Sequence, residues 1–178
     1  GEAEASHLAK TKAYAVSSQD YDALLFGAPR LIQNLTLARK RKTVSGWIEI
    51  NPEIIELEHV LNHLQITHEQ LICLGILIGT DYNPGGVRGI GPKKALNLVK
   101  QYKQPAIIFD VIREQIATQE NSFDWMEIFP LFKKPNVKDF EIKFPKFDEK
   151  MIKEILVDRH EFSEERLKTQ VEKMQEFS

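Results

Sequence analysis

The sequence predicts an α/β fold whose second half is mostly helical. Two observations support the α/β part: helix formers at residues 3–10 lead directly into a short apolar strand at 13–17, and two β-rich runs follow. The third observation is that the apolar residues beyond residue 51 mostly repeat with helical spacing. A chain of 178 residues is long enough to bury a sizeable core around such elements.

Composition and charge exclude several classes of protein. With 42% hydrophobic and 28% charged residues, the chain is neither disordered nor fibrous. The 24 Lys and Arg against 26 Asp and Glu give a net charge of −2, so any surface for nucleic acid must be local. The longest apolar run, residues 71–78, is far shorter than the roughly 18–20 residues of a membrane span, and no signal peptide precedes it. We therefore expect no membrane partner.

A single cysteine, Cys73, lies inside that apolar run. One cysteine excludes an internal disulfide framework and fits a reducing compartment. Its surroundings predict a small residue of the core.

The first part of the chain should continue with a hairpin. Residues 30–36 and 46–50 are rich in β-formers, and we expect them to pair, with the basic run 39–42 at the tip. That run could be a nuclear-localisation patch, but four cations at a hairpin tip are more often a solvated edge.

From Asn51 onward the sequence predicts helices. Asn51 is suited to the N-cap and Pro52 to the first position of a helix that reaches about residue 63. The apolar face of this helix would carry Ile54, Leu57, Leu61 and Leu64. Its two histidines, His59 and His63, are spaced i,i+4, but no third ligand suggests a zinc site.

Thr67 and Gln70 form a capping box that opens a nearly all-apolar, and therefore central, helix through Ile78. A glycine-rich loop follows at 79–91. The later elements are expected to be helices at 92–102, 105–117, 123–129, 148–157 and 164–176, the last capped by Ser163, and a strand at 140–144.

Five carboxylates stand at turns or element ends beside small or apolar residues: Glu2, Glu4, Asp20, Asp22 and Asp81. Anions gathered at the edge of a core repel one another unless a cation neutralises them, and Mg²⁺ or Mn²⁺ does so with oxygen ligands. An i,i+2 pair converges only where the backbone is extended or looped, because a regular helix turns the two side chains apart. Taken singly, Glu2 and Glu4 could be helix-start acids favoured by the helix dipole, and Asp20 and Asp81 could be loop caps. Such capping does not explain the five together, so we favour a metal site.

Residues 82–109 contain five cations and no acidic residue. Gly89 and Gly91 allow a sharp turn, and Pro92 then opens a helix whose free N–H groups suit a phosphate. Gly-Ile-Gly between two helices is the helix-hairpin-helix pattern, which grips the sugar-phosphate backbone without reading bases. A nucleotide-binding P-loop is disfavoured because a helix precedes the glycines and Pro-Lys-Lys follows them. A Gly-Pro turn with a solvated basic helix stays open as an alternative.

Four segments carry a resemblance to a known family: residues 1–5, 18–30, 79–96 and 162–166. In this order they resemble the C-terminal half of an archaeal flap endonuclease, a structure-specific 5′ nuclease. The resemblance covers nearly the whole chain. It implies a PIN-like nuclease core with a helix-hairpin-helix DNA-binding region. The activity it implies is that of a 5′ flap endonuclease and 5′–3′ exonuclease of DNA replication and repair, which hydrolyses phosphodiesters with two metals.

The resemblance also implies cofactors and residue roles. It implies two Mg²⁺ ions, for which Mn²⁺ can substitute, and a K⁺ at the hairpin. Glu2 and Glu4 resemble ligands of the first metal, whereas Asp20, Asp22 and Asp81 resemble ligands of the second. The residues that resemble the seat of the downstream duplex are Arg88, Gly89, Gly91, Lys93 and Lys94.

The implied organisation has three parts. Residues 1–80 would form the C-terminal part of the nuclease core, 81–120 the DNA-binding region, and 121–178 a helical extension packing on the core. Because the chain opens without Met, we expect a missing N-terminal half that carries further aspartates and a flap-threading arch. Without that half the chain should be inactive. Relative to the family, the chain is a few residues shorter near 10–13.

The expected partners are DNA with a 5′ flap and the missing half of the nuclease. The family also implies a sliding clamp, but the clamp motif is absent from the end of this chain. The expected location is cytoplasmic, nucleoid-associated and archaeal-like, without secretion. The alternative function is a non-catalytic duplex-DNA-binding module that retains the helix-hairpin-helix.

Overall fold

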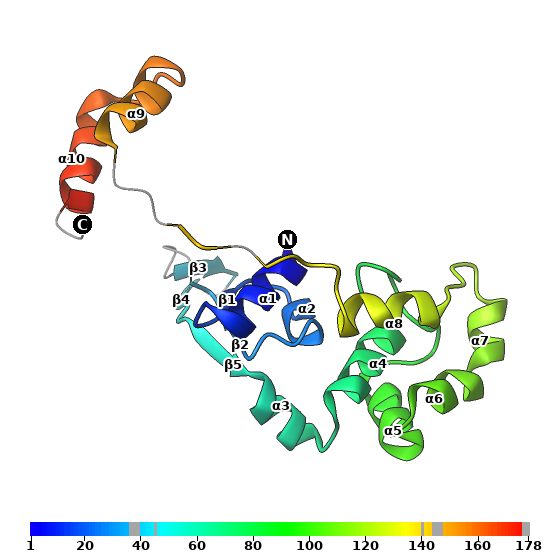
Figure 1. Cartoon of the computed structure of the whole chain (residues 1–178). Helices are drawn as coiled ribbons and strands as arrows, with labels where there is room; N and C mark the ends of the chain where they lie inside the picture. The colour runs from blue at the N-terminus through cyan, green and yellow to red at the C-terminus, as the bar shows by residue number, and fades with distance from the viewer. Residues whose placement is uncertain (36–39, 45, 140, 144–147, 176–178) are drawn as a thin grey trace. The chain divides into compact units, whose positions relative to one another are not determined.

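The computed structural model describes residues 1–35, 40–44, 46–139, 141–143 and 148–175. The chain divides into two units, Gly1–Lys138 and Asp139–Ser178 (Figure 1). The first unit contains a small sheet and most of the helices. Within the described residues, no helix combines the length and the apolar character needed to cross a bilayer.

The sheet of the first unit has the strand order β1-β2-β5. Strand β1 (Val16–Ser17) runs parallel to β2 (Arg30–Gln33), and β5 (Glu53–Glu56) pairs antiparallel with the other side of β2. Helices α1 (Glu2–Thr11) and α2 (Asp22–Leu25) lie beside this sheet (Figure 1). The helix-to-strand step expected at the start of the chain is thus confirmed, with a shorter strand.

The expected hairpin between residues 30–36 and 46–50 is wrong. Strand β4 (Gly46–Glu49) pairs instead with β3 (Lys40–Thr43) in a separate two-stranded sheet. The partners of β2 are apolar, because Leu31 lies opposite Ile55 on β5 and opposite Val16 on β1. This pairing buries Leu31 completely, which a pairing with the exposed strand β4 would not do. Of the basic run 39–42, residues 40–42 therefore belong to a strand, and Arg39 lies outside the described residues.

The helix expected from Asn51 is also wrong at its start. The chain is a strand through Glu56, and α3 (Leu57–Leu64) begins only after it. Ile54, expected on the buried face of the helix, instead lies on β5 with 55% of its surface exposed. Pairing with β2 overrides the local signal of an Asn-Pro helix start, because ladder hydrogen bonds and the burial of Leu31 favour the strand.

The remaining helices of the first unit surround α4 (His68–Ile78). Its capping box is formed as expected: the hydroxyl of Thr67 accepts the N–H of Gln70, and the side chain of Gln70 accepts the N–H of Thr67. Four of its residues are fully buried: Ile72, Cys73, Ile76 and Leu77. The full burial of Cys73 confirms it as a core residue, and this burial raises the pKa of its thiol to about 12.

Around α4 pack α5 (Pro92–Tyr102), α6 (Pro105–Val111) and α8 (Trp125–Lys133), with α7 (Arg113–Thr118) beyond α6 (Figure 1). The basic helix at 92–102 is confirmed at both ends. The helix expected at 105–117 is two helices, because it breaks at Ile112.

The second unit consists of two helical segments. Helix α9 (Glu149–Lys153) continues as a π-helical turn, η1 (Glu154–Asp158), and α10 (Glu164–Gln175) returns along it. Ion pairing between Lys153 and Glu164 joins the two segments, and the hydroxyl of Ser163 accepts the N–H of Arg166, as expected of a cap. The strand expected at 140–144 is absent from residues 141–143, and its two end residues lie outside the described range.

Candidate functional site

Three of the five singled-out acids come together beside the sheet. Glu2 is in the first turn of α1, whereas Asp20 and Asp22 lie where β1 leads into α2. Carboxylate oxygens of these three residues lie within 4.8 Å of one another. The two helices are held together locally by a buried hydrogen bond, in which the hydroxyl of Ser6 donates to the carbonyl of Ala23 at 3.2 Å.

The segment between β1 and α2 is a folded turn rather than the extended segment that convergence appeared to require. The hydroxyl of Ser18 accepts the N–H of Asp20 at 3.0 Å, and Oδ1 of Asp20 accepts the N–H of Asp22 at 3.0 Å. Such side-chain hydrogen bonds close a tight turn, which brings the i,i+2 pair to one side. Asp20 thus has the capping role weighed as an alternative and belongs to the cluster as well.

The electrostatics of the cluster follow from its crowding. Burial, together with the charges of Asp20 and Asp81, raises the pKa of Asp22 to about 6, although the backbone N–H of Asp81 donates to its carboxylate. Burial and the charges of Asp20, Asp22 and Asp81 likewise raise the pKa of Glu2. Ionised carboxylates in this arrangement repel one another, and a bound cation would relieve the repulsion.

Asp81 also lies at this site, although it comes from a distant part of the chain. It follows the end of α4 and lines a cavity of about 380 Å³ together with Glu2, Glu4 and Asp22. Tyr82 lines this cavity too, and its ring packs edge-on against buried Phe132 at 5.3 Å. Four acids from three parts of the chain therefore face one hollow.

Glu4 stands apart from the three clustered acids. Its carboxylate accepts a hydrogen bond from the amino group of Gly1, which lowers the pKa of Glu4, and about half of its side chain is exposed. Glu2 already lies in the regular part of α1, so the i,i+2 spacing turns the two side chains apart. A role of Glu4 as a metal ligand stays a prediction.

A buried asparagine, which sequence reasoning missed, holds Asp81 in place. Oδ1 of Asn83 accepts both the hydroxyl of Thr80 at 2.7 Å and the N–H of Thr80 at 3.2 Å. Its Nδ2 donates to the carbonyl of Ile76 at 2.7 Å. Asp81 lies within this ring of hydrogen bonds, so its backbone is tied to the last turn of α4. The spacing Thr80-x-x-Asn83 after a glycine is the signal that could have marked it as a turn.

The glycine-rich loop has a left-handed backbone at Gly89, as expected, and at Gly86, whereas Gly91, expected to share the turn, is extended with φ of −87°. Gly86 has φ of 59°, and a Cβ there would lie 2.3 Å from the backbone of Ile78, so only glycine fits. Gly89 has φ of 80° and open space where a Cβ would be. The tip of the loop therefore presents bare backbone to solvent.

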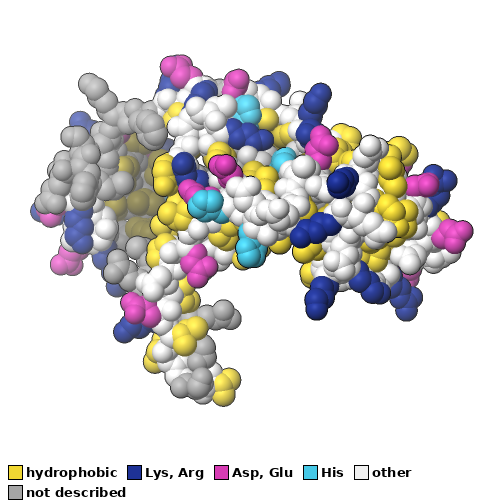
Figure 2. Space-filling model, turned by 90° about the horizontal axis from the view of Figure 1, so that it is seen from below, with side chains coloured by type: hydrophobic (Ala, Val, Ile, Leu, Met, Phe, Trp, Pro, Cys, Tyr) yellow, Lys and Arg dark blue, Asp and Glu magenta, His cyan; other side chains and the backbone are white. Residues whose placement is uncertain are grey.

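The expected phosphate-binding residues surround this tip. Gly91 is the N-cap of α5, and Lys93 and Lys94 are exposed in its first turn. Nζ of Lys94 donates to the carbonyl of Gly89 at 3.0 Å, and the side chain of Arg88 is exposed. Figure 2 views the molecule from below, and Lys and Arg side chains are prominent there on the helical part of the first unit.

The donor set suits a hard divalent cation. Carboxylate oxygens are the ligands that Mg²⁺ and Mn²⁺ prefer, and three of them approach one another closely enough to share one ion. Burial, followed by the neighbouring carboxylates, raises the pKa values of Glu2 and Asp22, and a bound cation would favour their ionised forms.

Comparison with known proteins gives concordant matches. The family described as XPG I-region matches residues 1–81. The chain is 51% identical to flap endonuclease 1 of Korarchaeum cryptofilum over 142 residues, which are 78% of this chain and 40% of that protein. Its structure matches a flap endonuclease-1 from Methanococcus jannaschii with a TM-score of 0.76 and 41% identity, over 97% of this chain and 49% of that one.

A more distant match supports the fold alone. The catalytic core of Rad2 in complex with DNA substrate has a TM-score of 0.68 at 15% identity, over 96% of this chain and 60% of that one. The chain spans about 40% of the length of the curated relatives that it matches.

Proposed function

Since the chain belongs to the flap endonuclease family and has the α/β fold of its PIN-like nuclease core, we propose that it forms part of a structure-specific 5′ nuclease. The loop at 79–91 carries this proposal. Near its start the loop carries Asp81, which lines the acidic hollow. It ends at the glycine turn beside the exposed lysines of α5. This short, internally hydrogen-bonded loop thus joins a carboxylate that suits a metal ion to a glycine turn that suits a phosphate.

The acids would hold two Mg²⁺ ions, with Mn²⁺ as a substitute. When bound, the ions polarise the scissile phosphate and lower the pKa of the attacking water. The protein's own part is positioning: the turn at Ser18 fixes Asp20 and Asp22, and Asn83 fixes Asp81. Because these residues are held by hydrogen bonds within the chain, their carboxylates need little rearrangement on binding.

The glycine turn would bind the DNA backbone. The exposed backbone at Gly89 and Gly91, the first turn of α5 and its two lysines offer N–H donors and positive charge to a phosphate. The substrate we propose is duplex DNA with a 5′ flap, with the downstream duplex on this turn and a K⁺ at the hairpin. The remaining ligands and the arch that threads the flap would come from outside these 178 residues.

The DNA-binding part is tested with Lys93→Ala combined with Lys94→Ala. Binding of a flapped duplex should weaken alike for two unrelated sequences, because backbone contacts carry no base information. The slope of log affinity against log salt should fall by about one to two, at roughly 0.9 per phosphate contact. An unchanged slope, or a loss confined to one sequence, would make the turn an ordinary solvated loop.

Titration with Mn²⁺ separates the nuclease from the alternative function. We expect Mn²⁺ to bind to the chain and to bind more weakly when Asp22 is replaced by asparagine. Duplex binding without any response to Mn²⁺ would instead indicate a non-catalytic duplex-binding module.

A further inference from the structure

Gln119 connects the end of α7 to the glycine turn, although it lies about thirty residues further along the chain. Its Oε1 accepts the N–H of Arg88 at 3.1 Å. Its Nε2 donates to the carbonyl of Gly86 at 3.0 Å and to the carbonyl of Asn121 at 2.8 Å. One half-buried side chain thus bonds both a donor and an acceptor of the turn and anchors them to its own backbone segment.

The other hydrogen bonds of the turn, including one from Ile90 to Val87 that closes over Arg88, do not engage the N–H of Arg88 itself. The N–H of Gly86 donates to Asn83, that of Val87 to Leu77, and that of Ile90 to Val87. Gly86 and Gly89 have left-handed φ values, and glycine backbone has more freedom to lose on ordering than that of other residues. Of the two residues between these glycines, Val87 bonds to Leu77 and Arg88 bonds to Gln119.

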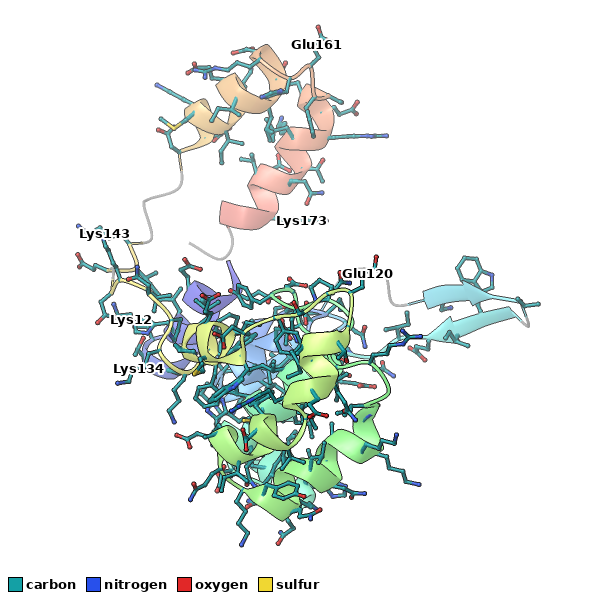
Figure 3. The ribbon with its side chains drawn as sticks, turned by 90° about the vertical axis from the view of Figure 1, so that its right-hand side faces the viewer. Lys12, Glu120, Lys134, Lys143, Glu161 and Lys173 are labelled. Atoms are coloured by element: carbon teal, nitrogen blue, oxygen red, sulfur yellow. The ribbon has the colours of Figure 1, made fainter. Side chains whose placement is uncertain are left out.

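The orientation of Gln119 differs from that of its neighbour. Glu120 projects outward from the first unit into solvent (Figure 3). The backbone at Gln119 is extended, with φ of −83° and ψ of 153°, and a turn begins at Glu120. Just beyond the end of α7, Gln119 thus points inward and bonds the glycine turn.

We propose that Gln119 is a positioning residue that holds the segment from Gly86 to Gly89 in the conformation that receives a duplex phosphate. This inference rests on the proposed function of the turn. Gln119 would act through the backbone of Arg88 and would not itself contact DNA. Holding a loop in its bound conformation raises affinity by lowering the ordering cost of binding. Loss of Gln119 should therefore weaken binding without removing a phosphate contact.

The test is Gln119→Met, which keeps the side-chain length and removes both hydrogen-bonding groups. Gln115→Met is the matched control, because Gln115 lies in α7, one turn before Gln119, with its side chain exposed. Each variant of the 178-residue chain is titrated with a flapped duplex over a salt series. Gln119→Met should bind several-fold more weakly at every salt concentration with the wild-type slope, and Gln115→Met should bind as wild type does.

The outcomes distinguish this inference from the proposed function. If Gln119→Met binds like wild type while the Lys93 and Lys94 double variant loses affinity, the inference is overturned and the function stands. If neither substitution changes binding, the function itself has failed. A slope lowered by about one unit for Gln119→Met would mean a lost phosphate contact, which contradicts a role through the backbone.

A measurement on the wild-type chain covers the case in which the variant fails to fold. Amide hydrogen exchange reports whether the N–H of Arg88 is bonded. We expect it to exchange markedly more slowly than the amide of an exposed loop residue without a backbone partner. Exchange as fast as that of such a residue would overturn the inference, whatever the variant does.

Discussion

Asp20 shows that one side chain can cap a turn and belong to a metal site. One of its oxygens accepts the N–H of Asp22, while its charge raises the pKa values of Glu2 and Asp22. The two roles respond differently to substitution, because asparagine keeps the acceptor oxygen and loses the charge, whereas alanine loses both. Single substitutions can therefore separate them.

We expect Asp20→Asn to unfold in EDTA at the wild-type temperature or above, since it removes repulsion and keeps the turn. Its stabilisation by Mn²⁺ should be much smaller than that of wild type. Asp20→Ala should be less stable than Asp20→Asn by about 0.5–2 kcal/mol, the usual loss of a cap. Thermal unfolding with and without Mn²⁺ measures both effects, with Glu120→Gln as the control. Equal stabilisation of wild type and Asp20→Asn by Mn²⁺ would remove Asp20 from the metal site.

His68 introduces a pH dependence of stability near the start of α4. Its Nε2 lies 3.1 Å from the carbonyl of Leu24, which can only accept, so the neutral ring carries its proton there. Burial, and to a smaller extent Lys10 and Lys133, lowers the pKa of His68. A lowered pKa means that the folded chain binds the proton less readily than the unfolded one.

The contribution of His68 to stability should therefore be complete above its ordinary pKa of 6.5 and be lost as pH falls through its lowered pKa. As pH decreases from 7.5 to about 5, the unfolding temperature of the wild-type chain should fall more than that of His68→Gln. Other titrating groups are common to both proteins and cancel in the difference. His63→Gln, at an exposed position, is the control. Parallel curves for wild type and His68→Gln would contradict this prediction.

Among the elements, the loop that follows α4 is more ordered than its glycine content suggests. The side chain of Asn83 bonds the N–H and the hydroxyl of Thr80 and also the carbonyl of Ile76 in the last turn of α4. Gly86 lies against the backbone of Ile78. Hydrogen bonds to a buried side chain, rather than regular structure, determine the path of this loop. The position of Asp81 depends on it.

Asn83→Ala should destabilise the chain by on the order of 2–4 kcal/mol, because it leaves buried groups of Thr80 and Ile76 without their partner. It should also weaken Mn²⁺ binding, since Asp81 would lose its fixed position. Urea unfolding and Mn²⁺ titration measure the two effects. Asn97→Ala, on the exposed side of α5, is the matched control. A loss of less than about 0.5 kcal/mol, the usual range of surface changes, would show that Asn83 does not support the loop.

For the molecule as a whole, the activity that we expect depends on how much of its relatives' length the chain spans. The chain spans about 40% of the curated flap endonucleases, yet it contains a crowded group of acids in which the pKa values of Glu2 and Asp22 are raised. We interpret this group as part of a larger active site.

The purified 178-residue chain should therefore bind flapped duplex but not cleave it at an appreciable rate with Mg²⁺. The physical reason is that metals held by too few ligands, without a segment to thread the flap, leave the phosphate poorly positioned. A time course with labelled flapped DNA measures this. Robust cleavage that disappears in Asp22→Asn would contradict the prediction, because it would show a complete active site within this chain.

The elements that the sequence predicts well are those determined by neighbouring residues. The capping box of Thr67 and Gln70 and the proline that opens α5 act within one turn of helix, and both helices are found at their predicted bounds. The sharp turn predicted at Gly89 and Gly91 is confirmed at Gly89, whereas Gly91 has an ordinary φ of −87° and the left-handed φ of Gly86 was not anticipated. The confirmed features needed no knowledge of what packs against them.

Only the tertiary structure decided the strand partners and the spatial grouping of the site. Strand β2 pairs with β1 and β5 rather than with β4, because burial of Leu31 between distant segments outweighs local signals such as Asn51-Pro52. The sequence indicated five acids as one group, whereas the packing of α1 against α2 brings Glu2 to Asp20 and Asp22 and leaves Glu4 outside that cluster, although it lines the same hollow. Gln119 has no local pattern at all. Its contact with Arg88 arises from the return of α7 toward the turn, and a contact between distant residues depends on the path of the whole intervening chain.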